Sequence, residues 1–286
     1  MKIAVIGADG QLGSDLVKTL AKDEVKPLFF PGFDVTEPQK MRKVFEEMKP
    51  VVVINTAAFH RVDECEDQPE ESFRVNALAV RDLARLAREL NFVLVHFSTD
   101  YVFDGQKGSP YTEENPPNPL NVYAVSKLAG ELFVRSLLDR YFLIRTCGLF
   151  GEASSREKGY NFVDRMIALD REGKTLRVVA DQWVTPTATA ELAERVGKLI
   201  RSHHYGLYHL TSEGECTWFR FAEEVFALLG RKARLEAVDS KTFGAKARRP
   251  LYSVLENKKA REIGLKDFSP WNIALGTYLR RKGLIP

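Results

Sequence analysis

The first half of the chain alternates short apolar runs, rich in β-branched residues, with longer stretches of helical periodicity. The apolar runs are four to six residues long, and they cover residues 2–6, 26–30, 51–54, 92–97 and 142–146. Strands that are apolar on both faces belong in a parallel sheet covered by helices on both sides. The alternation therefore predicts right-handed βαβ crossovers and an α/β fold with a doubly wound parallel sheet of the Rossmann type.

Four helices are predicted between these strands. The first runs from residue 11 to Lys22, and the second has Thr36 as its N-cap and Pro38 in its first turn. An acidic stretch over 63–71 is interpreted as an exposed helix start. The four predicted helices cover residues 11–22, 37–48, 72–90 and 123–138.

The rhythm changes after Gly151. A polar loop at 151–159 is followed by mixed elements, with helices predicted at 161–171, 188–201, 218–229 and 271–281 and strands at 176–180 and 205–210. We assign residues 1–150, together with 181–203, to an NAD(P)-binding Rossmann domain. Residues 151–180 and 204–286 are assigned to a smaller C-terminal α/β lobe that binds the substrate. A cleft between the lobes is the expected ligand site.

The charge balance excludes two classes of partner. The chain has 42 Lys and Arg against 39 Asp and Glu, a net charge of +3, and the charges are interspersed. No basic stripe points to nucleic acid or to an anionic membrane, and no apolar run approaches the length of a membrane span. The chain opens directly on a predicted strand, without a signal-peptide pattern. We therefore expect a soluble protein of the cytoplasm.

Cysteine and histidine usage points to neither a disulfide framework nor a metal site. Cys65, Cys147 and Cys216 are far apart and form no CxxC pair, which fits a reducing compartment. The histidines lack metal-ligand spacing, and His96 is interpreted as a buried core residue. No metal is predicted.

A glycine-rich loop joins the first predicted strand to the first predicted helix. Its sequence over residues 7–13 is GADGQLG. Glycine permits an unusual turn and close approach of the backbone to a pyrophosphate, and the following helix N-terminus offers free N–H groups to that anion. A tight turn without a ligand would fit the same spacing, which is GxxGxxG rather than GxGxxG. Because the loop lies at the first βα turn, we interpret it as a dinucleotide site.

The choice between NADPH and NADH stays open. Asp34 lies about 20 residues beyond the loop, where an acidic side chain would bind the ribose hydroxyls of NAD. It also follows Pro31-Gly32 and fits a turn or a helix start equally well. No arginine directly follows the second predicted strand to bind a 2′-phosphate.

A tyrosine and a lysine are predicted to share one helix face. Tyr123 and Lys127 are four residues apart in the run YAVSK. A phenol is a poor acid at neutral pH, and a nearby ammonium group favours its anion and eases proton transfer. The pair alone would also fit a half-buried tyrosine beside an exposed lysine.

The strand that ends at Phe97 is followed by Ser98, Thr99 and Asp100. This is the carboxyl edge, where open α/β sheets bind ligands. A hydroxyl there can hydrogen-bond the same substrate oxygen as Tyr123, although simple strand termination would explain these residues too.

Together these residues resemble the dTDP-4-dehydrorhamnose reductase family of the extended short-chain dehydrogenase/reductase superfamily, over essentially the whole chain. The motifs that carry the resemblance are GADGQLG (7–13), DVT (34–36), VVVINTAAF (51–59), FRVNALA (73–79), FSTDYVFDG (97–105), YAVSKLAGE (123–131), GYNFV (159–163), DQWVTPT (181–187) and RRPLYSVL (248–255).

The resemblance implies roles for individual residues. The implied catalytic residues are Thr99, Tyr123 and Lys127. The implied cofactor contacts are Gly7, Gly10, Gln11, Leu12, Gly13, Asp34, Val35, Ala57, Ala58, Tyr123 and Lys127. The expected substrate contacts are Ser98, Thr99, Asp100, Tyr123, Asn161, Arg248 and Arg249.

The basic residues near position 250 can be interpreted in two ways. Lys246, Arg248 and Arg249 would form either an exposed basic loop or a clamp on a nucleotide-sugar diphosphate, because arginine matches phosphate geometry. The family resemblance favours the clamp.

The chain departs from the family pattern at several positions. Many members have a tryptophan that packs on the sugar, and Gly148 stands in its place here. The loop at 152–158 is longer, and Val184 replaces a usual glycine. Some members bind Mg2+ between subunits, and one of those acids falls on Asp15, which is shorter than the usual Glu; this metal is not carried over.

The resemblance implies NAD(P)H-dependent reduction of the C4 keto group of a nucleotide-activated 4-keto-6-deoxy sugar, with dTDP-4-dehydro-L-rhamnose as the first candidate. A nucleotide-sugar epimerase stays an alternative. So does a non-catalytic regulatory subunit that resembles the methionine adenosyltransferase β subunit. Dehydratases of the superfamily carry Asp-Glu after the catalytic Thr, whereas Thr99 is followed by Asp100-Tyr101. The oligomeric state is left open, with a homodimer as one option.

Overall fold

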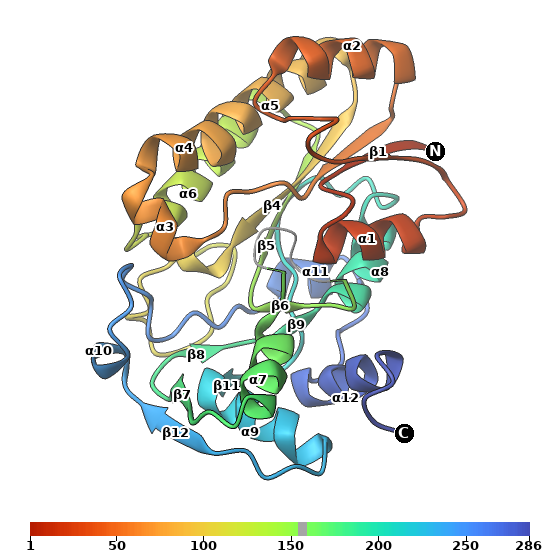
Figure 1. Ribbon diagram of the computed structural model, residues 1–286. Coiled ribbons are helices and arrows are strands. Elements are labelled where there is room, and N and C mark those ends of the chain that lie inside the picture. Colours follow the sequence, from red (N-terminus) through yellow and green to blue (C-terminus); the bar gives the residue numbers. More distant parts are fainter. Residues whose placement is uncertain (154–158) are drawn as a thin grey trace.

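The centre of the computed structural model, which describes residues 1–153 and 159–286, is a six-stranded sheet (Figure 1). All its neighbouring strands are parallel. The winding direction reverses between β1 and β3, as in other doubly wound sheets. In spatial order the strands are β10 (Gly206–His209), β5 (Tyr141–Thr146), β4 (Val93–Thr99), β3 (Val52–Asn55), β1 (Lys2–Ile6) and β2 (Glu24–Leu28). The predicted Rossmann-like fold class is confirmed.

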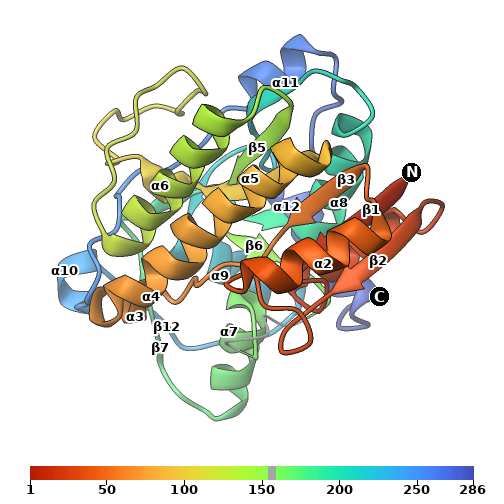
Figure 2. The same cartoon turned by 90° about the horizontal axis from the view of Figure 1, so that it is seen from above.

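Helices cover both faces of the sheet (Figure 2). Successive side chains of β1 alternate between the faces, so that Val5 packs in one hydrophobic cluster and Ile6 in another. The first cluster is completed by α1 (Gln11–Thr19), α8 (Thr189–Leu199) and α11 (Lys258–Glu262). The second is completed by α2 (Pro38–Met48), α5 (Ala79–Leu90) and α6 (Val122–Leu137).

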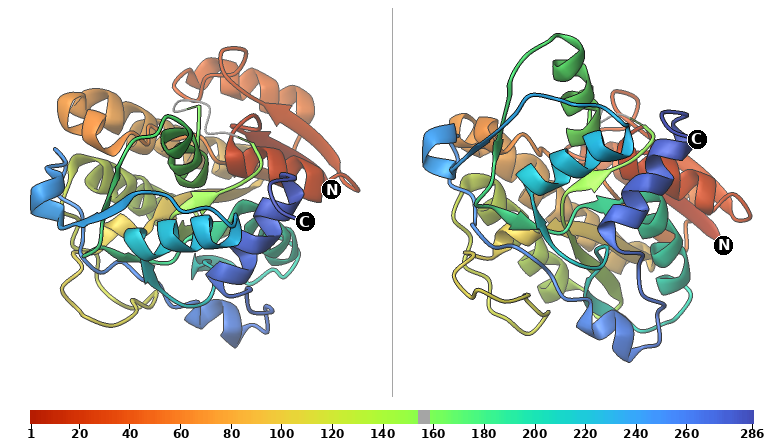
Figure 3. Two further views of the ribbon diagram at one scale, coloured as in Figure 1. Left: turned by 60° about the horizontal axis from the view of Figure 1, so that its bottom comes forward. Right: turned by 90° about the horizontal axis from the view of Figure 1, so that it is seen from below.

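A smaller set of elements lies below the carboxyl edge of the sheet (Figures 1 and 3). Its cores form around Phe221 and Phe226. Its helices are α7 (Phe162–Arg171), α9 (Trp218–Leu228), α10 (Ser240–Phe243) and α12 (Trp271–Arg281). Its strand pairs are β6 (Leu149–Phe150) with β9 (Thr187–Ala188), β7 (Leu176–Val179) with β12 (Leu235–Val238), and β8 (Trp183–Val184) with β11 (Cys216–Thr217).

The helix predicted over 72–90 is divided by a π-helical turn. The chain runs through α3 (Val62–Asp67), α4 (Pro69–Phe73), the π turn (Arg74–Leu78) and α5. Helix α6 passes very close to this turn, because a Cβ on Gly130 would lie 2.4 Å from the carbonyl oxygen of Asn76. The predicted helix includes this turn, because the apolar pattern over 72–90 did not reveal it.

Most predicted elements are present with shifted ends. Strand β2 begins two residues before the predicted start, and α1 ends at Thr19 instead of Lys22. Thr36 was predicted as the N-cap of α2, but Glu37 precedes that helix, and Thr36 instead donates two hydrogen bonds to Asp34. Helix α12 has the predicted bounds. Residues 154–158 of the predicted loop, and with them most of its predicted lengthening, lie outside the described residues.

The position of strand β10 differs from the one expected when the chain was divided into lobes from its sequence. Residues 204–286 were assigned to the smaller lobe, but β10 pairs with β5 along Gly206–His209 and extends the central sheet. Ala260 and Phe268 also pack in the first cluster of the sheet. In the described parts of the chain, every helix is too short or too polar to cross a lipid bilayer.

Candidate functional site

The glycine loop between β1 and α1 is built so that two of its glycines cannot be replaced. Gly7 has φ +73°, and a Cβ there would lie 2.6 Å from Thr56 Oγ1. A Cβ on Gly13 would lie 2.0 Å from the carbonyl oxygen of Gly7. Gly10 is the N-cap of α1 in an extended conformation, and a Cβ there would meet only that carbonyl, at 3.3 Å. Gly10 therefore faces open space at the N-terminus of α1.

The same loop carries an unpaired polar atom. Gln11 Oε1 is buried and has no hydrogen-bond partner among the described residues. The N–H groups at the N-terminus of α1, beside glycines without side chains, suit the pyrophosphate of a dinucleotide. The amide oxygen of Gln11 can only accept, so it would take a donor such as a ribose hydroxyl. The side chain of Leu12 is buried in the first cluster, so the predicted cofactor contact of this residue would come from its backbone.

The loops that follow β2 and β3 flank the glycine loop. Thr56 Oγ1 donates to the carbonyl oxygen of Ile6 at 2.7 Å, and the backbone N–H of Ala57 donates to Asn55 Oδ1 at 3.1 Å, so Ala57 and Ala58 follow a fixed turn. Asp34 Oδ1 accepts from both the N–H and the hydroxyl of Thr36, each at 2.8 Å. The turn role considered for Asp34 is thus present, and its contact with a ribose stays a prediction.

Val35, which precedes Thr36, is buried in the second cluster. Its side chain packs inside the protein, so a cofactor contact at this position would come from its backbone.

Tyr123 and Lys127 lie on α6 and approach the end of β4. Lys127 is 2% exposed, and its Nζ donates to the carbonyl oxygen of Phe97 at 2.6 Å. Tyr123 lies edge-on to Tyr101, with ring centroids 6.3 Å apart and an interplanar angle of 83°. The i, i+4 spacing places both groups on the sheet side of α6, as predicted.

Three side chains fix the first turn of α6. Asn121 is its N-cap and accepts from the N–H of Ala124 at 2.8 Å. Glu66 Oε1 accepts from the N–H of Val122 at 2.8 Å. Asn76 donates to Ser126 Oγ at 3.0 Å and so ties α6 to the π turn. The first two contacts satisfy N–H donors that a helix start leaves unpaired, and all three hold the start of α6, which carries Tyr123.

The hydroxyl of Thr99 is held from behind by a buried carboxylate. Thr99 Oγ1 donates to Asp100 Oδ1 at 3.0 Å, and Asp100 Oδ2 accepts from Ser253 Oγ at 2.5 Å and from Cys147 Sγ at 3.1 Å. Asp100 is 3% exposed. The carboxylate predicted to contact the substrate is therefore occupied by three protein donors, and it positions Thr99. Ser98 Oγ is buried without a partner in the described part of the chain.

The pKa values of these groups are shifted mainly by burial. Burial raises the pKa of Tyr123, and the Thr99 hydroxyl partly opposes this. Burial lowers the pKa of Lys127 to about 8, while the charge of Glu131 acts in the opposite direction. Burial also raises the pKa of Asp100. At neutral pH the site thus holds a protonated phenol and an ammonium group, which is the state in which Tyr123 can donate a proton.

An ion pair without solvent contact continues the polar face of α6. Glu131 is 0% and Arg145 1% exposed, and the Arg145 guanidinium makes two hydrogen bonds to the carboxylate, at 2.9 and 2.6 Å. Two-point pairing of this kind is strong and rigid. The pair places the negative charge of Glu131 one helical turn beyond Lys127, and Arg145 compensates that charge.

The three predicted substrate contacts outside the sheet differ in their hydrogen-bond partners and in their exposure. Asn161 is the N-cap of α7, and its amide donates to the carbonyl oxygen of Gly151 and to the Tyr278 hydroxyl. Arg249 pairs with Asp63. The side chain of Arg248 is exposed, and its carbonyl oxygen accepts from Asn121. Substrate contacts of these residues stay predictions.

The acidic stretch that was interpreted as an exposed helix start has internal partners. Asp63 accepts from Arg249, Asp67 pairs with Lys246, and Glu66 binds the start of α6. Sequence reasoning missed these contacts, together with Tyr101 and Ser253. The one available signal was the opposite charge of the stretches 63–67 and 246–249.

Gly148 stands beside an aromatic side chain of the smaller lobe. It has φ +53°, and a Cβ there would lie 3.2 Å from both Trp218 Cη2 and Pro186 Cα. Trp218 in turn packs against Phe162 with ring centroids 4.8 Å apart. Space for a side chain at position 148 is thus already limited by the neighbouring indole.

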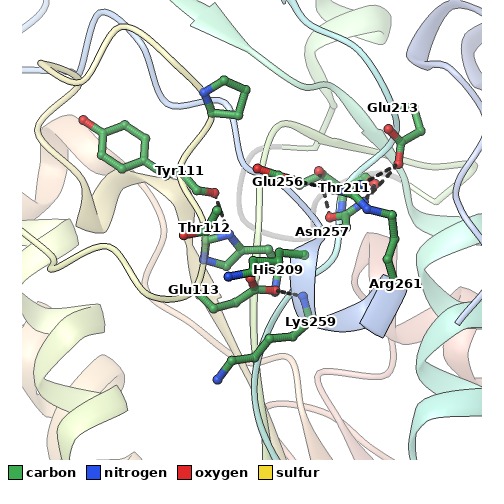
Figure 4. A network of polar contacts seen from close by, with 12 residues as sticks. Tyr111, Thr112, Glu113, His209, Thr211, Glu213, Glu256, Asn257, Lys259 and Arg261 are labelled. Carbon is green, nitrogen blue, oxygen red and sulfur yellow. Dashed lines mark hydrogen bonds and ion pairs between the residues drawn. The ribbon is translucent and has the colours of Figure 1, made fainter. Parts of the chain in front are cut away.

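A buried polar network ties β10 to the segment that precedes α6 (Figure 4). His209 Nδ1 lies 3.0 Å from the carbonyl oxygen of Tyr111, and the N–H of His209 donates to Glu113 Oε1 at 2.9 Å. Asn257 exchanges two hydrogen bonds with the backbone of Thr211, at 3.0 and 2.8 Å. Burial lowers the pKa of His209 to about 3. His209 is therefore neutral and structural.

Acidic residues near Asp15 do not form a metal site. Asp15 is 4% exposed and accepts from the Thr189 hydroxyl at 2.6 Å, and Glu191 accepts from the backbone and hydroxyl of Ser269. Within the described residues, no three His, Cys, Asp or Glu side chains are grouped to hold a metal ion.

Comparisons with known proteins find matches that cover nearly the whole length of the chain. The family described as RmlD substrate binding domain matches residues 1–283. The chain is 38% identical to a dTDP-4-dehydrorhamnose reductase of Streptomyces griseus over 95% of this chain and 90% of that one. It is also 38% identical to a dTDP-4-keto-6-deoxy-D-glucose reductase of Streptomyces niveus, over 95% of this chain and 94% of that one. A crystal structure of dTDP-4-dehydrorhamnose reductase from Bacillus anthracis in complex with NADP has a TM-score of 0.94 and 35% identity, and the match covers 98% of this chain and 99% of that one.

Proposed function

The chain belongs to the dTDP-4-dehydrorhamnose reductase family of the extended short-chain dehydrogenase/reductase superfamily, and from this membership we propose that it reduces the C4 keto group of a dTDP-4-keto-6-deoxy sugar with NADPH or NADH. The first candidate for the substrate is dTDP-4-dehydro-L-rhamnose, which would yield dTDP-L-rhamnose. The observation that carries the proposal is the placement of Tyr123 and the buried Lys127 one turn apart on α6, at the carboxyl end of β4.

Each residue of the site has a separate role in the reduction. A dihydronicotinamide held by the glycine loop and the N-terminus of α1 would supply the hydride for C4 of the sugar. Tyr123 donates its phenolic proton to the C4 oxygen, so that the carbonyl becomes a hydroxyl and the phenol becomes a phenolate. Lys127 stabilises that phenolate, and solvent returns the proton. Thr99 would turn its hydroxyl proton from Asp100 to the carbonyl oxygen of the substrate and so orient the carbonyl.

The two ligands are assigned to different parts of the molecule. Gly10, Gln11 and the N-terminus of α1 would hold the pyrophosphate of the cofactor, and Ala57 and Ala58 would line its path across β3. The substrate would lie between the carboxyl edge of the sheet and the smaller lobe. Arg248 is exposed near Asn121, the N-cap of the catalytic helix, and is the candidate for the sugar-nucleotide diphosphate.

The test is a spectrophotometric assay of nicotinamide oxidation with a panel of nucleotide 4-keto sugars, using NADPH and NADH in parallel. A reductase consumes one dihydronicotinamide for each sugar reduced. An epimerase would interconvert sugars without net consumption, and this outcome would overturn the proposal. A regulatory subunit would show no turnover and would copurify with a second, unrelated chain.

Two further expectations belong to this proposal. Cys65, Cys147 and Cys216 are all buried, and none forms a disulfide within the described residues, which supports a cytoplasmic location. Cell fractionation tests it. The homodimer named above is tested by sedimentation at equilibrium, in which a monomer mass would exclude it.

A further inference from the structure

Thr146, the last residue of β5, has a buried hydroxyl with no partner. The residue is 6% exposed, and Oγ1 makes no hydrogen bond to any described residue. Leaving a buried polar group unpaired costs a protein free energy, so such groups are rare in folded chains. The missing partner of this hydroxyl therefore needs an explanation other than the packing of β5.

The other buried threonines show that this fold does satisfy such groups. Buried threonine hydroxyls at six other positions all take part in a hydrogen bond within the described residues, namely Thr99, Thr185, Thr187, Thr189, Thr211 and Thr217. Thr146 is the exception.

The position of Thr146 is the second observation. It pairs in register with Thr99 across the parallel strands β4 and β5. Paired residues of parallel strands project from the same face of a sheet, so the two hydroxyls lie side by side at the carboxyl edge. The next residue, Cys147, donates to Asp100, the same carboxylate that holds Thr99. Thr146 thus borders the catalytic residues directly.

Two more buried polar atoms without partners lie along the same edge. Gln11 Oε1 follows β1, and Ser98 Oγ stands near the end of β4. The glycine loop is on β1, and β5 lies on the far side of β4 from it. A cofactor that runs from the glycine loop past β3 to Tyr123 reaches β4. The space at the end of β5 is then left for the second ligand.

We propose that the Thr146 hydroxyl binds the substrate. It hydrogen-bonds an oxygen substituent of the hexose, at or next to the keto carbon. The proposal rests on the proposed function, because it takes the second ligand to be a nucleotide-activated keto sugar. A hydroxyl both donates and accepts, so it suits a sugar hydroxyl or a carbonyl oxygen equally. Thr146 would fix the sugar on the side opposite the nicotinamide, while Thr99 faces the reacting carbonyl.

The experiment compares Thr146→Val, which keeps the shape and removes the hydroxyl, with Thr146→Ser, which keeps the hydroxyl. We expect Thr146→Val to raise the sugar KM by about 3- to 10-fold, as for one ordinary hydrogen bond, and Thr146→Ser to restore it. Because the hydroxyl has no hydrogen-bond partner among the described residues, the melting temperature of Thr146→Val should be unchanged or raised.

Thr187→Val is the matched control. Its hydroxyl donates to the carbonyl oxygen of Thr185 at 3.0 Å, so its loss should lower the melting temperature and leave the sugar KM unchanged. The dissociation constant of NADPH should be the same in all variants. An unchanged sugar KM in Thr146→Val would overturn the proposal, and so would a weakened affinity for NADPH.

A binding measurement separates this proposal from the proposed function. Calorimetry with dTDP-L-rhamnose and with dTDP alone needs no turnover. We expect Thr146→Val to weaken binding of the sugar nucleotide and not of dTDP. If the wild-type protein binds the sugar nucleotide but reduces no keto sugar, the proposed function fails while the role of Thr146 is still decided. Equal affinities of wild type and Thr146→Val for dTDP-L-rhamnose would refute the role.

Discussion

Arg249 and Asp63 form a two-point ion pair between segments that are 186 residues apart in the chain. Arg249 Nη2 lies 2.9 Å from Asp63 Oδ2, and Nη1 lies 3.1 Å from Oδ1. The N–H of Ala247 also donates to Asp63, at 2.8 Å. The acidic helix α3 therefore holds the basic segment in place next to α6, and the guanidinium of Arg249 is already engaged.

This pairing separates the roles of the two neighbouring arginines. We predict that Arg248→Ala raises the sugar-nucleotide KM by about 10- to 100-fold, because a charge-assisted hydrogen bond is worth about 1.5–3 kcal/mol. Arg249→Ala and Asp63→Ala should raise KM less and to a similar extent, and the double variant should be no worse than either. Steady-state kinetics on the four proteins checks this. Additive effects of the two changes would show that Arg249 contacts the substrate independently of Asp63.

Tyr123→Phe should lose most turnover and keep its affinity for NADPH. The ring and its edge-on contact with Tyr101 remain, whereas the proton donor is removed. General acid catalysis contributes about 10²–10⁴-fold, and kcat should fall by this factor. Activity close to that of the wild type would remove Tyr123 from its role.

The alkaline limb of the pH profile should reflect the loss of a proton from the Lys127 ammonium group. Its pKa is lowered from 10.5 to about 8 by burial, so the ammonium group that stabilises the phenolate is present at neutral pH and is lost as pH rises through about 8. We predict that kcat/KM for reduction falls above about pH 8. In Lys127→Arg the charge persists in this range, so the residual activity should lack that limb. A limb near 10.5 in the wild type would contradict the assignment.

Two glycines of the phosphate loop should respond in opposite ways. In Gly13→Ala the new Cβ would meet the carbonyl oxygen of Gly7 at 2.0 Å, so the backbone must shift, and we expect a loss of about 1–3 kcal/mol of unfolding free energy. Gly10→Val should leave the melting temperature nearly unchanged and raise the Kd of NADPH by about tenfold, or 1.4 kcal/mol. Denaturant unfolding and cofactor titration measure the two effects. Full cofactor affinity in a folded Gly10→Val protein would show that the loop is only a turn.

The buried His209 should make the protein sensitive to acid (Figure 4). Its folded pKa, about 3, lies below the unfolded value of 6.5, so the unfolded chain takes up the proton first as pH falls below 6.5. Each pH unit in that window costs about 1.4 kcal/mol of unfolding free energy. Glu113, whose pKa burial raises, acts with the opposite sign in the carboxylate range.

His209→Asn keeps a donor near Tyr111 and removes the titration. Its unfolding free energy should therefore fall less steeply than that of the wild type between pH 6.5 and the acid range, as followed by urea unfolding. Parallel slopes for the two proteins would show that His209 does not carry the acid sensitivity.

Local features of the fold could be predicted from the sequence, because their signals are local. The glycine loop, the Tyr123–Lys127 spacing and the bounds of α12 each depend on residues within a few turns of one another. The family resemblance then gave the reaction, which the comparisons support.

Contacts between distant segments could not be predicted in this way. The pairing of Asp63 with Arg249 and the cap that Glu66 provides for α6 have no periodic signal, because exposed-looking charges are compatible with many partners. The π turn at Asn76 interrupts a helix without changing its apolar pattern. The edge position of β10 depends on pairing with β5, which no single segment specifies.

That edge position also determines the order in which the sheet can be completed during synthesis. Strand β5 pairs with β4 on one side and with β10 on the other, and β10 begins at Gly206, beyond all of β6 to β9, α7 and α8. A nascent chain that has left the ribosome only to residue 150 presents β5 as an open edge, with unpaired backbone groups that attract other strands. A fragment that ends at residue 150 lacks both β10 and α8, so it should aggregate more readily than the whole chain.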